Sequence, residues 1–133
     1  MKQYLLDTNI CAFFLRQRYD IDKRIENIGW ENCCISDITV LELYYGAENS
    51  NNPAYNMQIT QHFCESIHVI PVCDVAHQYA IEKVKLRKKG TLIDDFDLLI
   101  AATAIHENCV LVTENIRHMD RFENLKVENW VNR

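Results

Sequence analysis

Short apolar runs alternate with longer stretches of helical spacing along most of this 133-residue chain. The runs predict five strands, over residues 4–6, 34–36, 67–72, 110–113 and 126–128. Pro71 has no amide hydrogen for a ladder bond, so the third strand should lie at a sheet edge or end there. Parallel strands need a long crossover connection, commonly a helix. The alternation therefore predicts an α/β fold with a central, mainly parallel sheet.

The stretches between these runs predict helices. Their apolar spacing, capping residues and terminal glycines place them at about residues 10–14, 20–30, 37–47, 54–64, 74–89 and 93–106. The candidate N-terminal caps are Thr8 or Asn9, Ser36 or Asp37, and Asp74. No internal repeat or linker-like stretch divides the chain, so we predict a single domain over residues 1–133.

Composition narrows the class of protein. With 3 glycines and 2 prolines, the chain is neither collagen-like nor low-complexity. No run approaches the ~20 apolar residues of a membrane span, and the apolar run at the N-terminus is too short for a signal peptide. Most of the 6 cysteines lie in apolar runs and none forms a C-x-x-C pair, which favours buried reduced thiols over a zinc site. We therefore expect a cytoplasmic protein.

The net charge of −5 indicates which kinds of molecule the protein is suited to bind. Nucleic-acid binders are usually basic, so this charge counts against RNA. An acidic balance is nevertheless compatible with a metal site made of carboxylates, and it would attract a basic partner.

Polar side chains follow two predicted strands at their C-terminal ends. Asp7 comes directly after the first strand, while Thr113 closes the fourth and Asn115 follows it. The carboxyl ends of parallel strands meet at one edge of the sheet, where α/β folds bind ligands. Asp7 and Asn115 therefore share one crevice if their strands are neighbours, although a helix cap explains Asp7 alone equally well.

Three further carboxylates lie in helical segments. Glu42 has Ile38 and Tyr45 at helical spacing, and Asp97 opens an apolar helix without a basic residue nearby, so both charges are costly unless something pairs with them. Asp94 lies three residues before Asp97 and would share its face. A distant Lys or Arg could instead pair with Glu42, and Asp94 could simply stabilise the start of the helix.

Gathered in one site, these acids would repel each other by about 4 kcal/mol per pair at ~4 Å and an effective dielectric of ~20. A hard divalent cation such as Mg²⁺ takes oxygen ligands and removes that repulsion. It can also activate a water for attack on a phosphodiester. The pattern therefore favours a metal site made of carboxylates.

The same residues lie in motifs that resemble the PIN-domain family, and within it the VapC toxins of type II toxin–antitoxin pairs. Five segments resemble the family's motifs in the right order and cover nearly the whole chain: Asp7-Thr8-Asn9, Val40 to Gly46, Asp94 to Ala104, Val112 to Asn115 with His118-Met119, and Leu125 to Trp130.

The resemblance implies a three-layer α/β/α fold with a five-stranded parallel sheet. It also implies a Mg²⁺ site, with Mn²⁺ as an alternative, whose catalytic ligands are Asp7, Glu42 and Asp97. The residues implied to support this site are Asp94, Thr8, Asn9, Thr113 and Asn115. Asn115 stands where many relatives have a fourth acid, which argues against a complete second metal site, with Glu114 as the alternative acid.

The resemblance further implies an endoribonuclease, in which a metal-activated water attacks RNA in line and leaves a 5′-phosphate and a 3′-hydroxyl. Structured RNA such as transfer RNA is the implied substrate, and a homodimer is the implied assembly. A small VapB-like antitoxin would hold the toxin inactive and bind operator DNA, so that contact with DNA is only indirect.

Basic residues that could hold the RNA backbone lie in two places. Arg87 and Lys88 belong to a cluster over residues 83–89 that is equally well explained as a solvated helix end. Arg117 is favoured because it is close in sequence to Asn115.

Other functions fit less well. An aspartyl phosphatase needs a D-x-D motif after its first strand, and Asn9 takes the second position. A phospho-acceptor receiver domain needs a lysine after its last core strand and acids before its acceptor, and neither is evident. The remaining alternative is a degenerate PIN fold that binds protein or RNA without catalysis, against which Asp7, Glu42 and Asp97 argue.

Overall fold

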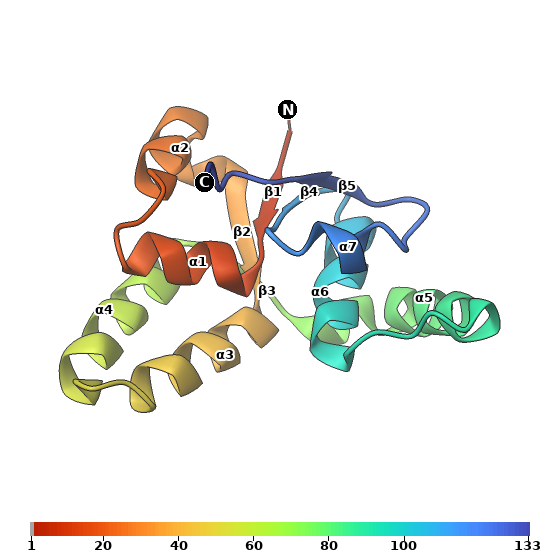
Figure 1. The fold of residues 1–133 in the computed structure, drawn as a ribbon, viewed down its shortest axis with the longest axis horizontal. Coiled ribbons are helices and arrows are strands. Elements are labelled where there is room, and N and C mark those ends of the chain that lie inside the picture. Colours follow the sequence, from red (N-terminus) through yellow and green to blue (C-terminus); the bar gives the residue numbers. More distant parts are fainter. Residues whose placement is uncertain (1) are drawn as a thin grey trace.

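A sheet of five short strands stands in the middle of the structure, with helices on both faces (Figure 1). The structure, a computed structural model, describes residues 2–133. The strands are β1 (Tyr4–Leu6), β2 (Cys33–Ser36), β3 (His68–Ile70), β4 (Val110–Val112) and β5 (Lys126–Glu128). Their order is β3-β2-β1-β4-β5 and every pair is parallel. The predicted three-layer α/β/α class, the parallel sheet and the edge position of the third strand are therefore confirmed.

Seven α-helices and two 3₁₀ turns connect the strands in the described part of the chain. They are α1 (Thr8–Leu15), α2 (Ile21–Ile28), η1 (Trp30–Asn32), α3 (Asp37–Glu48), α4 (Pro53–Ser66), η2 (Val72–Val75), α5 (Ala76–Lys89), α6 (Asp95–His106) and α7 (Ile116–Met119). Within residues 2–133, no helix combines the length and the apolar character that crossing a membrane would need.

Successive strand residues point to opposite faces of the sheet and so separate two cores. Leu5 of β1 and Leu111 of β4 pack with residues of α5, α6 and α7. The next residues along each strand, Leu6 and Val112, pack with residues of α1, α2, α3 and α4. The apolar run of each central strand is therefore explained by burial on both faces.

The strand order creates a crevice at one place in the sheet. The chain continues from β1 through β2 and β3 on one side, and then returns to β4 and β5 on the other. Ligand sites of open α/β sheets lie at such a switch point, outside the carboxyl ends of the strands. The first and fourth strands are neighbours, so the condition for a shared crevice is met.

Two of the predicted helix caps differ in the structure. Asp7 caps α1, rather than Thr8 or Asn9, because its carboxylate accepts a hydrogen bond from the Thr8 amide at 2.7 Å. Ser36 caps α3 as predicted. Asp74 caps no helix, since it lies within η2 and α5 begins without a side-chain cap.

All six cysteines are free. The expected burial is confirmed for four of them, while Cys64 is half-buried and Cys73 is exposed. Burial raises the pKa of the Cys33 thiol to about 11, so this side chain stays protonated and packs as a small apolar group.

Candidate active site

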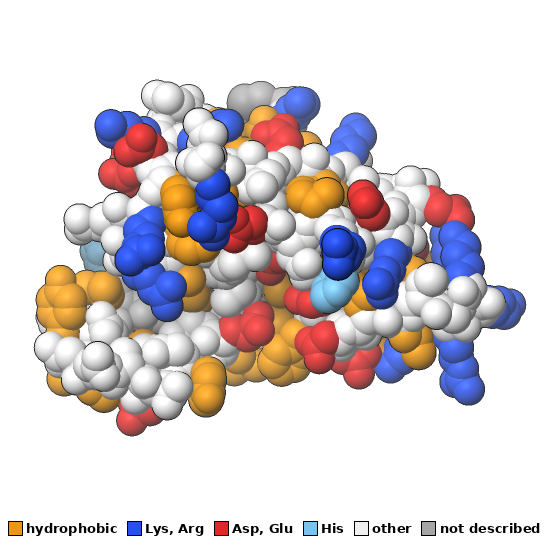
Figure 2. Space-filling view, in the orientation of Figure 1, with side chains coloured by type: hydrophobic (Ala, Val, Ile, Leu, Met, Phe, Trp, Pro, Cys, Tyr) orange, Lys and Arg blue, Asp and Glu red, His pale blue; other side chains and the backbone are white. Residues whose placement is uncertain are grey.

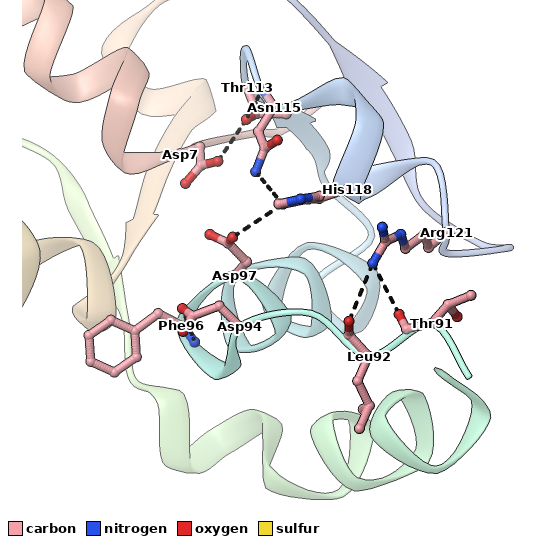
Figure 3. Close-up of polar contacts among 10 residues, drawn as sticks. All are labelled: Asp7, Thr91, Leu92, Asp94, Phe96, Asp97, Thr113, Asn115, His118 and Arg121. Carbon is pink, nitrogen blue, oxygen red and sulfur yellow. Dashed lines mark hydrogen bonds and ion pairs between the residues drawn. The ribbon is translucent and has the colours of Figure 1, made fainter. Parts of the chain in front are cut away.

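Asp7 lies at the C-terminal end of β1 and is only 4% exposed. Its carboxylate accepts two hydrogen bonds, from the Thr113 hydroxyl at 2.7 Å (Figure 3) and from the Thr8 amide at 2.7 Å. The amide of Asn115 in turn donates to the Thr113 hydroxyl at 2.9 Å. Burial raises the pKa of Asp7 above its ordinary value, the two hydrogen bonds oppose this effect, and the charge of Asp97 adds to it. The ends of β1 and β4 therefore meet in one site, as the sequence predicted.

Thr113→Val is expected to lower the free energy of unfolding by about 1–3 kcal/mol, because a buried carboxylate oxygen loses its partner while the side chain keeps its size. Urea denaturation at pH 7 measures the loss. Thr103→Val is the matched control. Thr103 is equally buried, and its hydroxyl donates at 2.7 Å to the Leu99 carbonyl. In Thr103→Val that carbonyl still accepts its backbone hydrogen bond within the helix, so no buried group loses its only partner. Equal losses in the two variants would contradict a special role for the hydrogen bond to Asp7.

Glu42 comes from α3 and is held at the crevice by Thr8. The Thr8 hydroxyl donates to Glu42 Oε1 at 2.6 Å, so the neighbouring Thr39 hydroxyl, at 3.1 Å, must be the donor to Thr8. Of the two apolar residues at helical spacing from Glu42, Ile38 is buried and Tyr45 is 70% exposed, so this side of α3 is only partly covered. In the described chain a hydroxyl, rather than a Lys or Arg, pairs with this carboxylate.

Asp97 and Asp94 lie at the start of α6. The helix begins at Asp95 rather than at residue 93, and Asp94 is its cap, which agrees with the alternative that this residue stabilises the start of the helix. Its carboxylate accepts a hydrogen bond from the Phe96 amide at 3.1 Å. Burial raises the pKa of Asp97, and the charges of Asp94 and Glu42 raise it further, whereas His118 opposes the shift. Carboxylates from α3 and α6 are therefore close enough to interact, as the sequence predicted.

Asn115 and His118, rather than a fourth acid, complete the group on the side of β4. Asn115 Nδ2 lies 3.0 Å from His118 Nδ1, and that nitrogen lies 3.8 Å from Asp97 Oδ2 (Figure 3). The sequence predicted Asn115 in this site but not the role of His118, although the three-residue spacing places both residues on one side of a short helix. Glu114 is held by Arg133 at 2.6 Å and is not part of the group.

The donor set fits a hard cation. The Asn9 Oδ1 atom is buried and has no hydrogen-bond partner within residues 2–133, and such atoms usually bind a water or an ion. No three His, Cys, Asp or Glu side chains of the described chain are close enough to enclose a metal together. This spacing is compatible with Mg²⁺, which usually keeps several waters and takes one or two carboxylates directly. It does not fit a structural zinc ion, which needs four protein ligands.

Charge is distributed unevenly around this site. Figure 2 shows Asp and Glu side chains around a hollow in the middle of the molecule, with Lys and Arg side chains toward its rim. Arg117 is exposed on α7, one residue from His118. Arg87 and Lys88 are exposed in the last turn of α5, and that end of α5 lies at the outer end of the molecule, away from α1 and α3 (Figure 1). Of the three predicted RNA contacts, Arg117 is therefore the one near the carboxylates.

Comparisons with known proteins agree with this geometry. Residues 4–125 match the family described as the PIN domain. The chain is 38% identical to Ribonuclease VapC2 of Haemophilus influenzae, in an alignment that covers 98% of this chain and 100% of that protein. It is 33% identical to the tRNA(fMet)-specific endonuclease VapC of Salmonella typhimurium, with 98% and 99% covered.

Solved structures give the same result. The crystal structure of DNA-bound VapBC from Salmonella typhimurium contains a chain that matches with a TM-score of 0.90 and 32% identity, covering 98% of this chain and 99% of that one. VapBC2 from Rickettsia felis, bound to a promoter DNA fragment, matches with a TM-score of 0.86 and 34% identity, with 96% and 98% covered. The resemblance carried by the five sequence motifs is confirmed.

Proposed function

The chain belongs to the PIN-domain family, and we propose on that premise that it is a VapC-type endoribonuclease that hydrolyses RNA with the help of Mg²⁺ or Mn²⁺. One observation carries the proposal: Asp7 is buried and held by two hydrogen bonds, the charge of Asp97 raises the pKa of Asp7, and the charges of Asp94 and Glu42 raise the pKa of Asp97. Such a group of acids is costly in a fold unless a cation or proton offsets it.

The contacts support a role for each residue. A divalent cation bound directly by one or two of Asp7, Glu42 and Asp97, and through water by the rest, would supply Lewis acidity and an activated water. Thr8 orients two of these carboxylates at once, since its amide donates to Asp7 and its hydroxyl to Glu42. Thr113 holds the other oxygen of Asp7. This rigidity supports catalysis because a displacement of about 1 Å can cost roughly 100-fold in rate.

RNA is the proposed substrate in spite of the net charge of −5. The cation would offset the acids where the phosphate binds, and basic side chains at the rim would hold neighbouring phosphates. Arg117 is the favoured contact, and Arg87 and Lys88 would meet only a long RNA. A structured RNA such as transfer RNA fits this distribution, and one relative is named for the tRNA that it cuts.

A VapB-like antitoxin is the proposed partner, because the similar solved structures are VapBC complexes. Contact with DNA would be made through that antitoxin. A homodimer in the cytoplasm is the proposed state, and the exposed apolar side chains of Leu41, Tyr45 and Phe96 offer surface for protein contacts.

The test is cleavage of total bacterial RNA by the chain purified free of antitoxin. Discrete fragments are expected with Mg²⁺ or Mn²⁺ and none with EDTA, and Asp7→Asn should reduce the rate at least about 100-fold. Cleavage by the variant at the wild-type rate would indicate a contaminating nuclease. RNA binding without cleavage under any of these conditions would favour the degenerate, non-catalytic PIN fold.

A further inference from the structure

We propose that the recess between α1, α3 and α4 is a subsite for one RNA base beside the cleaved phosphate, and that Gly46 keeps this subsite open. The inference rests on the proposed ribonuclease function and adds a determinant of where RNA is cut. The recess has a volume of about 230 Å³ and begins at Thr8 and Glu42, so it is continuous with the carboxylate site.

The size and the walls of the recess suit a flat ring. Pockets for drug-sized ligands start at about 300 Å³, so this recess is too small for a whole nucleotide and large enough for part of one. Its apolar walls come from three helices and are formed by Ala12, Leu15, Leu43, Ala47 and Ile59. Enzymes that take a base out of its stack hold it between aromatic or apolar side chains.

Polar groups lie at the far end of the recess, where the edge of a base would be. Asn56 Nδ2 donates to the Ser50 hydroxyl at 2.8 Å, and that hydroxyl donates to the Ala47 carbonyl at 2.6 Å. Within residues 2–133 no hydrogen bond uses Asn56 Oδ1 or the hydroxyl of Thr60, although both residues line the recess. These groups remain available to the donor and acceptor edge of a base.

Arg16 also lines the recess, and its charge distinguishes RNA from an apolar peptide. Its side chain is exposed and, in the described chain, makes no ion pair or side-chain hydrogen bond. Lys83 and Lys89, by contrast, are paired with Asp95 and Glu123. A free guanidinium beside the recess can hold the phosphate of the base that enters it.

The helix α3 gives no structural reason for a glycine at position 46. It lies inside α3, four residues after Glu42 and therefore on the same face. A Cβ atom built on Gly46 would meet nothing within 4 Å, so alanine would fit and would favour the helix. Because Gly46 lines the recess, the missing side chain leaves room there for a ligand.

Two larger depressions, of about 380 and 390 Å³, are less suited to this role. One lies around Phe14, Trp30 and Phe63, and the other around Leu41 and Val72. Neither is lined by Asp7, Glu42 or Asp97, so a base in either would not lie next to the cleaved bond.

The test fills the recess and measures three properties of the full chain. Gly46→Leu is expected to lower kcat/KM for RNA cleavage at least about 10-fold and to change the distribution of cut sites. Mn²⁺ binding, measured by calorimetry, should stay unchanged. Gly46→Ala should lose less activity and raise the melting temperature by about 2–4 °C. Glu48→Leu places the same side chain on α3 outside the recess and is the matched control, with wild-type cleavage expected.

A binding measurement tests the recess without catalysis. The four nucleoside 5′-monophosphates are titrated into the ¹⁵N-labelled protein, and the signals of the Gly46 amide and the Asn56 side-chain amide are followed by NMR. At least one nucleotide should shift both signals in the wild type and neither in Gly46→Leu. Asn56→Ala serves as a second variant, with a changed base preference at the cut expected, so the test does not depend on the folding of Gly46→Leu.

The outcomes separate this inference from the proposed function. If the wild type cuts no RNA, the ribonuclease proposal fails, and the nucleotide titration still decides whether the recess takes a base. Cleavage by Gly46→Leu with unchanged efficiency and sites would overturn the inference. Weaker Mn²⁺ binding by Gly46→Leu would also overturn it, because the loss of cleavage would then come from the carboxylates. If Gly46→Leu keeps RNA cleavage but is no longer inhibited by the antitoxin, the recess binds a protein and the inference fails.

Discussion

Asp97→Asn is expected to slow RNA cleavage by on the order of 10³-fold and to leave the metal-free protein equally or more stable. Burial, followed by the charges of Asp94 and Glu42, raises the pKa of Asp97, so its charged form costs more free energy in the folded state than in the unfolded state. Asparagine has nearly the same shape and no charge. The variant therefore relieves repulsion while removing a ligand oxygen, although it gives up the weak attraction to His118 at 3.8 Å.

Asp95→Asn is the matched control, because it makes the same change two residues earlier in the same helix. The Asp95 carboxylate lies 3.0 Å from Lys83 Nζ and accepts a hydrogen bond from the Tyr79 hydroxyl at 3.1 Å. These contacts lower its pKa, the opposite direction from Asp97. We expect Asp95→Asn to cut RNA within about twofold of the wild-type rate and to melt at a slightly lower temperature.

Initial rates on end-labelled RNA and scanning calorimetry without metal measure both properties. A similar loss of cleavage in the two variants would mean that the start of α6 has been disturbed, and not that a ligand has been removed. Full cleavage by Asp97→Asn would remove this residue from the proposed site.

The fold could be predicted because local patterns carry most of it. Every residue of β4 is buried, and its unbroken apolar run indicates a central strand. β5 has Lys126 and Glu128 at its ends and lies at the edge of the sheet. Pro71 correctly indicated the other edge. The pairing of β1 with β4 depends on contacts between residues more than 100 positions apart. The apolar runs predicted the five strands, and only the family resemblance implied that all five pair in one parallel sheet.

The site was predicted less completely, for physical reasons. Asp97 stood out because a charge within an apolar helix needs a partner. The same reasoning predicted a partner for Glu42 but could not name it, and periodicity does not show which face of α3 meets solvent. Its actual partner, the Thr8 hydroxyl, is 34 residues away in sequence. His118 was missed because its contact with Asp97 depends on how α7 packs beside α6.

The residue that caps α1 also could not be predicted from the sequence alone. Asp7-Thr8-Asn9 contains three good capping residues in succession, and the choice of Asp7 depends on where β1 ends. Because Asp7 is both the cap of α1 and a proposed metal ligand, the two explanations that the sequence left open are compatible with each other.

Mg²⁺ or Mn²⁺ is expected to raise the melting temperature at pH 7 and to do so less as the pH falls. At a concentration about 100 times its Kd, a cation that binds only the folded state stabilises it by about 2.7 kcal/mol. For a chain of this size that corresponds to roughly 5–10 °C. Scanning calorimetry at pH 7 and pH 5, with metal and with EDTA, measures the shift.

The metal-induced rise in melting temperature becomes smaller at low pH because the pKa values of Asp7 and Asp97 are raised. A carboxyl whose pKa is higher in the folded state than in the unfolded state, where it is about 3.9, binds protons more readily when folded. Its contribution to stability therefore falls as the pH rises through the window between the two values. The penalty is greatest above the folded pKa, where both groups are charged, and a cation relieves it most there because it displaces no proton.

The variant Asp7→Asn/Asp97→Asn isolates these two groups from the other acids. The half-buried Glu114 and the exposed Glu123 have lowered pKa values, so their contribution to the stability of the protein is lost as the pH falls, which opposes the effect of the buried pair. They are unchanged in the double variant, so the difference between the two proteins cancels their contribution. We expect the double variant to show little metal shift at either pH. An equal shift in both proteins would place the cation elsewhere, and a larger shift at pH 5 than at pH 7 would contradict the raised pKa values.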